Sequence, residues 1–367
     1  MSVRYIGCKN NLLPYIEEVT LKHSPQKGVF CDLFAGTHSV AAHFKKLGFQ
    51  IISNDLLYLA YVFGRALIQN NDKPTFSQLT HLPTTAPVRL FDGVDAYLKT
   101  LNYLNQLNPV SDGFIFNAYC PGGDNEYKRQ YLSNRNGQKI DAIRGQIEAW
   151  RQDDRITEDE YYILLLSLLE AVSKVTNISG TYGAYLKEWD ARTYKALTLE
   201  PFLPIPSDKI HTVYQEDANR LIEQIECDIL YIDPPYNTRQ YITNYHLLET
   251  IARYDNPSVY GKTGLRPYSE SEKSAYCSKL ECLRAFEALI LQARAKHIIV
   301  SYSSEGIMSE AEILDVLGQK GEMPQLIPID YRRFKSNSNG TSKNKRSVQE
   351  YLFYVETKQK ENRNRKA

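Results

Sequence analysis

The sequence contains no hydrophobic run that approaches the roughly 18 residues a membrane-spanning helix requires. It also shows no apolar segment after a basic N-terminal start, which is the pattern of a secretion signal. We therefore expect a cytoplasmic protein that has no association with a membrane.

Metal-binding and disulfide patterns are missing as well. The six cysteines are scattered, no two form a CxxC pair, and no histidines stand at a matching zinc-ligand spacing. The phosphate-binding pattern GxxxxGK[ST] is absent, which favours a ligand without phosphates over ATP. With 44 basic and 43 acidic residues, the chain has no overall basic excess for nucleic acid, although local basic patches remain possible.

What the sequence does contain is a regular alternation of short apolar runs and helical patterns. Its 367 residues, 43% of them hydrophobic, suffice for one large domain or two modest ones. Seven apolar runs are strand candidates, at residues 29–36, 49–55, 211–217, 227–236, 297–306, 325–331 and 350–356. This order predicts an α/β fold with a Rossmann-like, doubly wound, seven-stranded sheet.

The stretch from residue 61 to 210 interrupts that alternation. It holds polar, tyrosine-containing segments and a long apolar helix candidate, YYILLLSLLEAV. We interpret 61–210 as a mostly helical insertion into an α/β domain made of residues 1–60 and 211–358. The basic tail, 359–367, is expected to be frayed and disordered.

The loop DLFAGTHSV, residues 32–40, fits a nucleoside site at the carboxyl edge of the predicted sheet. Ligands bind there because backbone amides at a helix start and a nearby acid can meet a ribose. Asp32, the turn around Gly36, and Asp55, which lies 19 residues beyond Gly36, match that arrangement. Many α/β proteins share these features, so the loop alone is weak evidence.

A sharper signal is DILYIDPPYNTRQY, residues 228–241, where an apolar run leads into Asp233-Pro234-Pro235-Tyr236. Two prolines cannot continue a strand ladder, and they fix the backbone at the strand end. The Asp233 carboxylate and the Pro234 carbonyl could accept both N–H groups of an exocyclic amine while Tyr236 stacks on its ring. That geometry suits a base flipped out of a duplex. The structural alternative is a strand-ending turn with a capping acid.

Along the chain, the motifs follow in the order RYIGCKNNLLPYI (4–16), DLFAGTHSVAAHF, SNDL, the insertion, EDANRLI and DPPY. These motifs, in this order, resemble the Dam-like class of DNA adenine-N6 methyltransferases, which use S-adenosylmethionine. FokI-type modification enzymes are the most similar subgroup. The resemblance implies that Asp32 lies near the methionine part of the cofactor, Asp55 at its ribose and Asp217 at its adenine edge. It implies cofactor contacts by Tyr5, Gly7, Lys9, Asp32, Phe34, Ala35, Gly36, Thr37, Ser39, Asp55 and Asp217, and target-base contacts by Asp233, Pro234 and Tyr236.

His38 departs from the family pattern, which usually has glycine at that position. Because a residue that opens a helix does not need a positive φ, we expect a tolerated substitution whose side chain points away from the ligand or lines the pocket. Weakened cofactor binding is the alternative.

The resemblance makes double-stranded DNA the partner and the insertion a target-recognition region. The basic segment YRRFKSNSNGTSKNKR, 331–346, is expected to contact phosphates, and SGTYGAYLKEW, 179–189, suggests a hairpin over the DNA backbone. Arg and Asn side chains of the insertion can recognise base edges. The DNA-contact candidates are Arg129, Asn136, Lys187, Arg239, Arg332, Arg333, Phe334, Lys335, Lys343 and Lys345.

The predicted activity is therefore a site-specific adenine-N6 methyltransferase, in a restriction-modification or epigenetic role, that works as a monomer. A cognate restriction endonuclease acting separately on the same site is a possible partner. Three alternatives remain open: a DNA-binding regulator that has lost catalysis, a methyltransferase for cytosine N4, and one that acts on RNA or on a protein amide.

Overall fold

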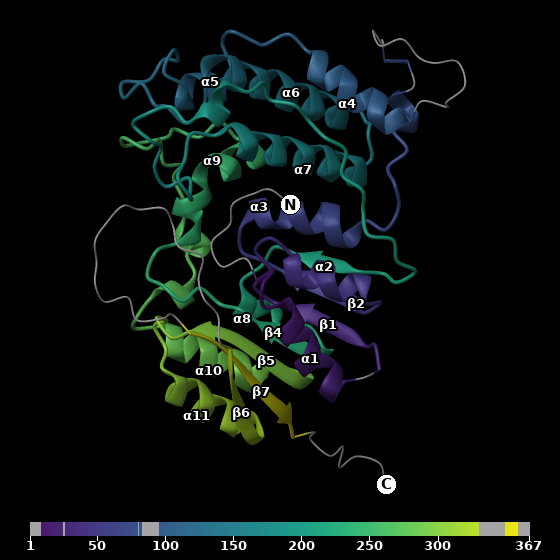
Figure 1. Ribbon diagram of the computed structural model, residues 1–367, viewed down its shortest axis with the longest axis vertical. Coiled ribbons are helices and arrows are strands. Elements are labelled where there is room, and N and C mark those ends of the chain that lie inside the picture. Colours follow the sequence, from purple (N-terminus) through teal and green to yellow (C-terminus); the bar gives the residue numbers. More distant parts are fainter. Residues whose placement is uncertain (1–8, 25, 80, 83–94, 330–348, 359–367) are drawn as a thin grey trace. The chain divides into compact units, whose positions relative to one another are not determined.

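The structure, a computed structural model, describes residues 9–24, 26–79, 81–82, 95–329 and 349–358 (Figure 1). The chain forms two compact units. The α/β unit consists of Lys9–Leu56, Lys209–Gln240 and the described part of Lys273–Ala367. The helical unit consists of Leu57–Asp208 together with Tyr241–Glu272.

The α/β unit is built on a seven-stranded sheet with the order β3-β2-β1-β4-β5-β7-β6. Neighbours among β1 to β5 run parallel, whereas β7 is antiparallel to both β5 and β6. The strands are β1 Val29–Asp32, β2 Gln50–Asn54, β3 Thr212–Tyr214, β4 Cys227–Ile232, β5 Ala295–Ser303, β6 Gly321–Ile329 and β7 Glu350–Thr357. Each lies on one of the seven predicted runs, and the α/β prediction is confirmed.

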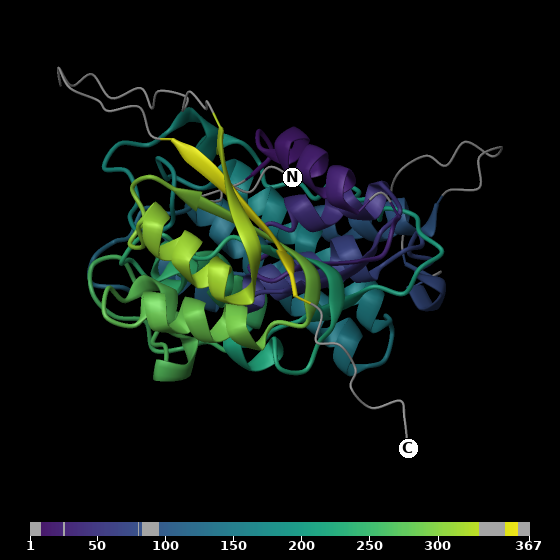
Figure 2. The ribbon, with the colours of Figure 1, turned by 90° about the horizontal axis from the view of Figure 1, so that it is seen from below.

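Helices cover both faces of this sheet because its strands alternate side chains between two apolar surfaces. Contacts place α2 against β1 and β2, and α11 against β6 and β7. Figure 2 shows α1, in purple, and α10 and α11, in green, on opposite sides of the yellow strands β6 and β7. The helices of this unit are α1 Leu13–His23, α2 Ser39–Lys46, α8 Ala218–Leu221, the 3-10 turn η5 Ala275–Cys277, α10 Cys282–Gln292 and α11 Glu310–Lys320.

Successive residues of β1 show this alternation. Phe30 stacks on Phe44 of α2 at a ring distance of 3.9 Å and meets Phe49 edge-on. Cys31, the next residue, points into the opposite core with Leu230 of β4. Because both faces of β1 are filled by buried apolar side chains, the strand is held rigidly, and so is the polar residue at its end.

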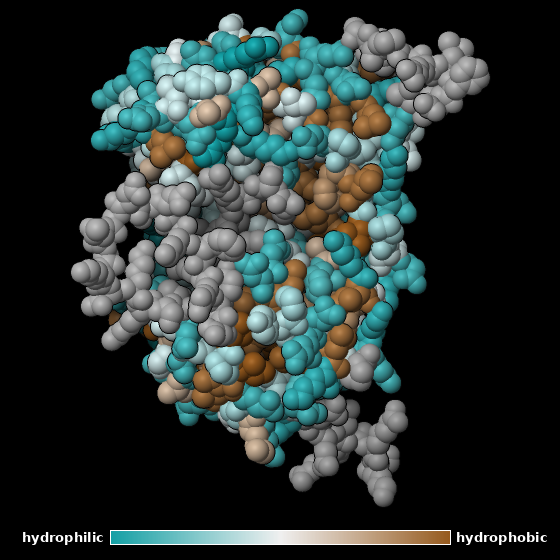
Figure 3. Space-filling view, in the orientation of Figure 1, coloured by the Kyte–Doolittle hydropathy of each residue, from teal (hydrophilic) through white to brown (hydrophobic). Residues whose placement is uncertain are grey.

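In the helical unit, α7 is the central element. Most of its residues are buried, and it contacts α3, α6 and α9. A capping box between Thr157 and Glu160 fixes its start. Over α4, α5 and α6, the face drawn in Figure 3 is mostly hydrophilic, as expected of helices whose apolar sides face inward. The helices are α3 Tyr58–Gly64, the π-helical turn η1 Arg65–Gln69, η2 Ser77–Leu79, α4 Ala96–Gln106, α5 Phe114–Tyr119, α6 Asn134–Gln152, α7 Glu158–Val175, η3 Ala191–Tyr194, α9 Tyr241–Arg253 and η4 Glu270–Glu272.

Helix α9 joins this unit although the sequence analysis placed it in the α/β domain. Ten of its residues are buried, so it needs packing partners on nearly all sides, and it contacts α3 and α7. The carboxylate of Glu249 also accepts hydrogen bonds from the backbone N–H groups of Tyr58 and Leu59 at 3.1 and 2.8 Å, which caps α3. Residues 241–272 therefore pack with the helical unit.

Two further findings concern the sequence predictions. None of the described helices is long and apolar enough to cross a membrane. Residues 179–189 form bends and turns without a strand ladder, so the predicted hairpin is wrong. Instead, the segment folds back on Asn177, whose side-chain amide donates to the carbonyl of Leu186 and whose side-chain carbonyl accepts from the N–H of Asp190.

Candidate active site

The candidate site lies where the strand order of the α/β unit reverses, between β1 and β4. From β1 the sheet continues through β2 to β3 in one direction, and from β4 through β5 in the other. Such a reversal opens a crevice beyond the carboxyl ends of the strands, which is the usual ligand site of an open α/β sheet. Asp32 ends β1 in register with Tyr231 of β4, and Asp233 follows two residues later.

The loops after β1, β2 and β3 are tied together by Asn54, a residue that the sequence analysis did not select. Its amide donates to the carbonyls of Leu33 and Glu216, and its side-chain carbonyl accepts from the N–H of Glu216. The side chain is buried. Since it satisfies three backbone groups from two loops, Asn54 fixes the edge on which the site is built. Its place beside Asp55, at the end of an apolar run, was an available signal.

Asp55 faces the turn at Gly36. The backbone N–H of Gly36 donates to Oδ2 of Asp55 at 2.8 Å, and Gly36 has a φ of 51°. This left-handed conformation suits glycine, because it has no Cβ to clash. The carboxylate is thereby oriented at the turn, on the edge where the sequence placed a ribose.

Asp32 is the most deeply buried acid of the group, with 1% of its surface exposed. Oδ2 accepts a hydrogen bond from the N–H of Ala41, whereas Oδ1 is buried and has no hydrogen-bond partner among the described residues. Burial raises the pKa of Asp32 to about 8, against the stabilising hydrogen bond from Ala41. A buried acceptor without a partner needs a donor, so the site suits a ligand with an N–H or ammonium group here.

His38 adopts a left-handed backbone conformation, with φ 58° and ψ 24°. The expectation that this position needs no positive φ is therefore wrong. The side chain is fully buried, and its Nδ1 lies 2.7 Å from the hydroxyl of Ser53 on β2. The imidazole is directed into the protein, and packing plus this hydrogen bond hold a conformation that costs a residue with a Cβ about 1–2 kcal/mol.

The remaining loop residues have local roles as well. Asp217 caps α8 through hydrogen bonds from the N–H groups of Asn219 and Arg220. Phe34 is half-buried, edge-on to the buried ring of Tyr276 at 4.9 Å. Ala35 and Thr37 are buried in the same turn, and Ser39 begins α2. These positions surround the turn predicted to bind the cofactor.

The DPPY motif follows β4 directly. Pro234 is buried, and Tyr236 is half-buried against the core below α8, α10 and α11. Asp233 forms an ion pair with Lys9, with 3.1 Å between Oδ1 and Nζ. Burial raises the pKa of Asp233, the charge of Lys9 lowers it, and the resulting pKa is about 6. The carboxylate is therefore mostly ionised at neutral pH and able to accept hydrogen bonds.

Several predicted residues lie elsewhere. Tyr5, Gly7, Arg332, Arg333, Phe334, Lys335, Lys343 and Lys345 fall outside the described residues. Lys187 in the helical unit and Arg239 in the α/β unit are exposed, as a contact with DNA would require. In the part of the chain that the structure describes, no group of three or more His, Cys, Asp or Glu side chains could hold a metal ion.

Arg129 and Asn136 do not fit the predicted base contacts. Arg129 is 5% exposed, and its guanidinium donates to the carbonyls of Ala118, Gly261 and Lys262. Asn136 is 2% exposed and bonds to the backbone of residues 193, 195 and 197. The polar atoms of both side chains form hydrogen bonds with backbone groups inside the protein. We therefore correct this prediction and assign both residues a structural role.

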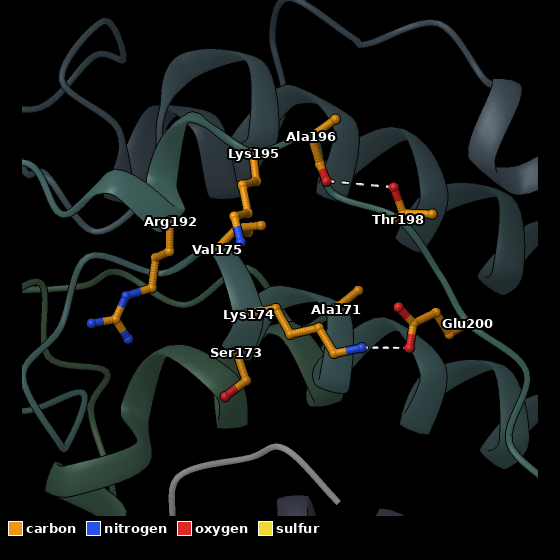
Figure 4. A pocket seen from close by; sticks show the side chains of 9 residues that line it. All are labelled: Ala171, Ser173, Lys174, Val175, Arg192, Lys195, Ala196, Thr198 and Glu200. Carbon is orange, nitrogen blue, oxygen red and sulfur yellow. Dashed lines mark hydrogen bonds and ion pairs between the residues drawn. The ribbon is translucent and has the colours of Figure 1, made fainter.

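The helical unit also has a pocket of its own, with a volume of about 560 Å³. Lys195 extends toward Val175 at its centre, and Lys174 turns to Glu200, with which it forms an ion pair of 2.6 Å (Figure 4). Arg192 points away from that pair and bonds to Asp190. The pocket contains no predicted site residue, and most of its charge is neutralised locally.

Comparison with known proteins agrees with the geometry of the α/β unit. The sequence profile of the D12 class of N6 adenine-specific DNA methyltransferases matches residues 5–316. The chain is 43% identical over 357 residues to the type II methyltransferase M.FokI of Planomicrobium okeanokoites, covering 96% of this chain and 52% of that protein. It is 43% identical over 361 residues to the type II methyltransferase M.NlaIII of Neisseria lactamica, covering 96% of this chain and 99% of that protein.

The modification methylase StsI of Streptococcus sanguinis is 41% identical over 359 residues, which are 97% of this chain and 52% of that protein. The chain thus spans about half the length of M.FokI and StsI, and nearly all of M.NlaIII.

Proposed function

Since the chain belongs to the D12 class of N6 adenine-specific DNA methyltransferases, whose members use S-adenosylmethionine as methyl donor, we propose that it methylates N6 of adenine in a specific sequence of double-stranded DNA. The observation that carries the proposal is the position of Asp233-Pro234-Pro235-Tyr236, which directly follows β4 beside Asp32 at the reversal of strand order.

The DPPY motif would bind the flipped target adenine. Asp233 and the carbonyl of Pro234 accept the two N6–H groups, and Tyr236 stacks on the ring. Because the N6 lone pair is delocalised into the ring, these hydrogen bonds matter: they favour a more tetrahedral nitrogen with its lone pair aimed at the methyl group. Transfer is then direct and needs no covalent enzyme intermediate.

The residues present fit S-adenosylmethionine, which supplies an electrophilic methyl group on a sulfonium. Oδ1 of Asp32, which has no partner in the described part of the chain, would be a buried acceptor for an ammonium group such as that of the methionine part. Asp55, held at the Gly36 turn, would accept from the ribose hydroxyls, and Asp217 would lie at the adenine edge. By the resemblance, Lys9 would complete the set together with Tyr5 and Gly7, which lie outside the described residues.

The helical unit is proposed to select the DNA sequence. Our proposed boundaries are those of its packing, 57–208 with 241–272, in place of 61–210. Exposed Lys187 and Arg239, with the basic segment 331–346, would contact phosphates. The relatives M.FokI, M.NlaIII and StsI are named as type II methyltransferases or a modification methylase. A role in protecting DNA from a separate restriction endonuclease is proposed on that basis.

The deciding experiment measures transfer of labelled methyl from S-adenosylmethionine to unmethylated genomic DNA, followed by mass spectrometry of the nucleosides. Asp233→Asn should lose methyl transfer while keeping cofactor binding. Glu226→Gln is the matched control, because Glu226 is an exposed acid just before β4, at the far end of that strand from Asp233. The control should keep wild-type transfer.

Each outcome has one meaning. N6-methyladenine formed by the wild type and the control, and lost in Asp233→Asn, supports the proposal. N4-methylcytosine in its place would assign the enzyme to the other exocyclic amine. Cofactor binding without any methylated base would refute the catalytic proposal and favour a DNA-binding regulator.

A further inference from the structure

Lys9 lies between two carboxylates in the candidate site. Its Nζ is 3.1 Å from Oδ1 of Asp233 and 3.4 Å from Oε2 of Glu350. The three side chains are 7%, 17% and 12% exposed, so little water screens their charges. Lys9 was expected to touch the cofactor, and Glu350 was not selected from the sequence.

The three residues come from distant parts of the α/β unit. Lys9 precedes α1, Asp233 follows β4, and Glu350 is the first residue of β7, paired with Ser303 of β5. Because β7 runs antiparallel, its start lies at the same sheet edge as the ends of the parallel strands. The fold itself therefore brings a second carboxylate to the DPPY motif.

The electrostatic consequence is a buried cluster with one positive and two negative charges. Burial disfavours the charge of Lys9, but the carboxylates of Asp233 and Glu350 outweigh this, and the pKa of Lys9 is raised. Lys9 thus stays protonated. Its charge lowers the pKa of Asp233, whereas the charge of Glu350 raises it.

We propose that Lys9 and Glu350 are positioning residues that set the protonation state of Asp233. The charge of Lys9 keeps the Asp233 carboxylate ionised. Glu350 holds the ammonium group of Lys9 in place, and its negative charge limits how strongly Lys9 favours the ionised form of Asp233. This inference rests on the proposed function, since it concerns the carboxylate that would receive the N6–H hydrogen bond. Lys9 alone would hold Asp233 ionised but would make it a poorer proton acceptor.

The balance of charges suits the proposed reaction. A bond forms between N6 and the methyl carbon while the bond from sulfur to that carbon breaks, so the positive charge moves from the sulfonium to N6. N6 then loses one proton, which Asp233 takes up and passes to water, while Lys9 keeps its own protons. An ionised Asp233 in a cluster of net negative charge stabilises the positive charge that arrives at N6.

Other titratable groups also face this cluster. The charge of Asp233 raises the pKa values of Asp32 and Tyr231, and Tyr236 contributes to raising the pKa of Lys9. Asp32 and Tyr231 come from neighbouring positions of β1 and β4. They are the same in every variant below, so a difference between the variants reports the residue that was changed.

The test is a titration of Asp233 in the 367-residue chain without DNA, by NMR of protein labelled with ¹³C at the aspartate carboxyl groups. The Asp233 signal is identified by its loss in Asp233→Asn. In the wild type it should titrate near the pKa of about 6. Removing an opposite charge at this distance raises a carboxyl pKa by about 1–3 pH units, so Lys9→Met should shift the titration upward by that amount.

Glu350→Gln should shift the titration in the opposite direction, by about 1 pH unit, because it removes a like charge and keeps an oxygen for Lys9. Lys9→Arg keeps the positive charge and should titrate close to the wild type. A general loss of structure cannot produce shifts of opposite sign. An unchanged pKa of Asp233 in Lys9→Met overturns the proposal, and an unchanged or raised one in Glu350→Gln overturns the role of Glu350.

The pH profile of methyl transfer is measured separately. The acidic limb of the kcat profile should move to higher pH in Lys9→Met, so that activity recovers as the pH is raised. It should move to lower pH in Glu350→Gln. A wild type that methylates DNA but whose NMR titration is insensitive to both changes would refute this inference and leave the function standing. Titrations that shift as expected, in a protein whose wild type transfers no methyl group, would refute the proposed function and leave the charge cluster around Asp233 standing.

Discussion

Replacing His38 tests whether a left-handed residue is a real constraint at the start of α2. Both His38→Gly and His38→Ala remove the 2.7 Å contact with the Ser53 hydroxyl and empty a fully buried position. Leaving a buried hydroxyl without its partner costs about 1–3 kcal/mol, and the cavity adds to that. We therefore expect both variants to be destabilised, by roughly 2–4 kcal/mol.

The informative quantity is the difference between the two variants. At φ 58° an alanine carries a left-handed penalty of about 1–2 kcal/mol, which glycine avoids. The greater conformational freedom that glycine loses on folding costs about 0.5–1 kcal/mol relative to alanine, which offsets part of this advantage. The glycine variant should therefore be the more stable of the two, by about 0.5–1 kcal/mol.

Amide hydrogen exchange with mass spectrometry is the appropriate assay, because both tryptophans, Trp150 and Trp189, lie in the helical unit and fluorescence would not report on α2. Peptides from β1, α2 and β2 give the free energy of opening, and peptides from α7 serve as an internal control. Ala42→Gly, inside α2, should show the usual order, with glycine less stable than alanine. An alanine variant at position 38 as stable as the glycine variant would refute the reasoning.

Three further predictions follow from buried or exposed charges. Asp32, with a pKa of about 8, is mostly protonated at pH 7, so binding of the cofactor's ammonium group should release a proton, and cofactor affinity should rise with pH up to about 8. Calorimetry in buffers of different ionisation enthalpy measures this proton release, with Asp32→Asn as the control. Glu249→Gln should cost about 1.5–3 kcal/mol, measured by urea unfolding with tryptophan fluorescence, because the fully buried carboxylate that caps α3 gives up charged hydrogen bonds and one of its two acceptor oxygens. Arg129→Ala should destabilise the helical unit, whereas Lys187→Ala should leave stability within about 0.5 kcal/mol and reduce the salt dependence of DNA binding by about one counterion. A destabilised Lys187→Ala, or an Arg129→Ala protein with only a DNA-binding defect, would contradict these assignments.

The sequence by itself determined the strands, the chemistry at their ends and the family. Periodicity located all seven strands, because a strand buried on both faces must be a continuous apolar run. Asp32, Asp55 and Asp233 could be placed at one edge because parallel strands all end there. Two adjacent prolines could only stand at a strand end, and Pro234 and Pro235 do follow β4. The strand and site inferences use local backbone rules and the alternation of strand and helix patterns, which favours parallel strands, whereas the family rests on the resemblance of the motifs.

Only the tertiary structure decided which polar groups meet. Glu350 reaches the site because β7 is antiparallel, and strand direction is not encoded in an apolar run. Arg129 and Asn136 are residue types that can recognise base edges, yet in the helical unit their side chains form hydrogen bonds with backbone carbonyls instead. His38 is left-handed because the turn at Gly36 and the contact with Ser53 impose it, although local propensity favours another conformation. Residues 241–272 join the helical unit because α9 is buried on nearly every side. Burial and partner choice depend on neighbours distant in sequence, which a local pattern cannot report.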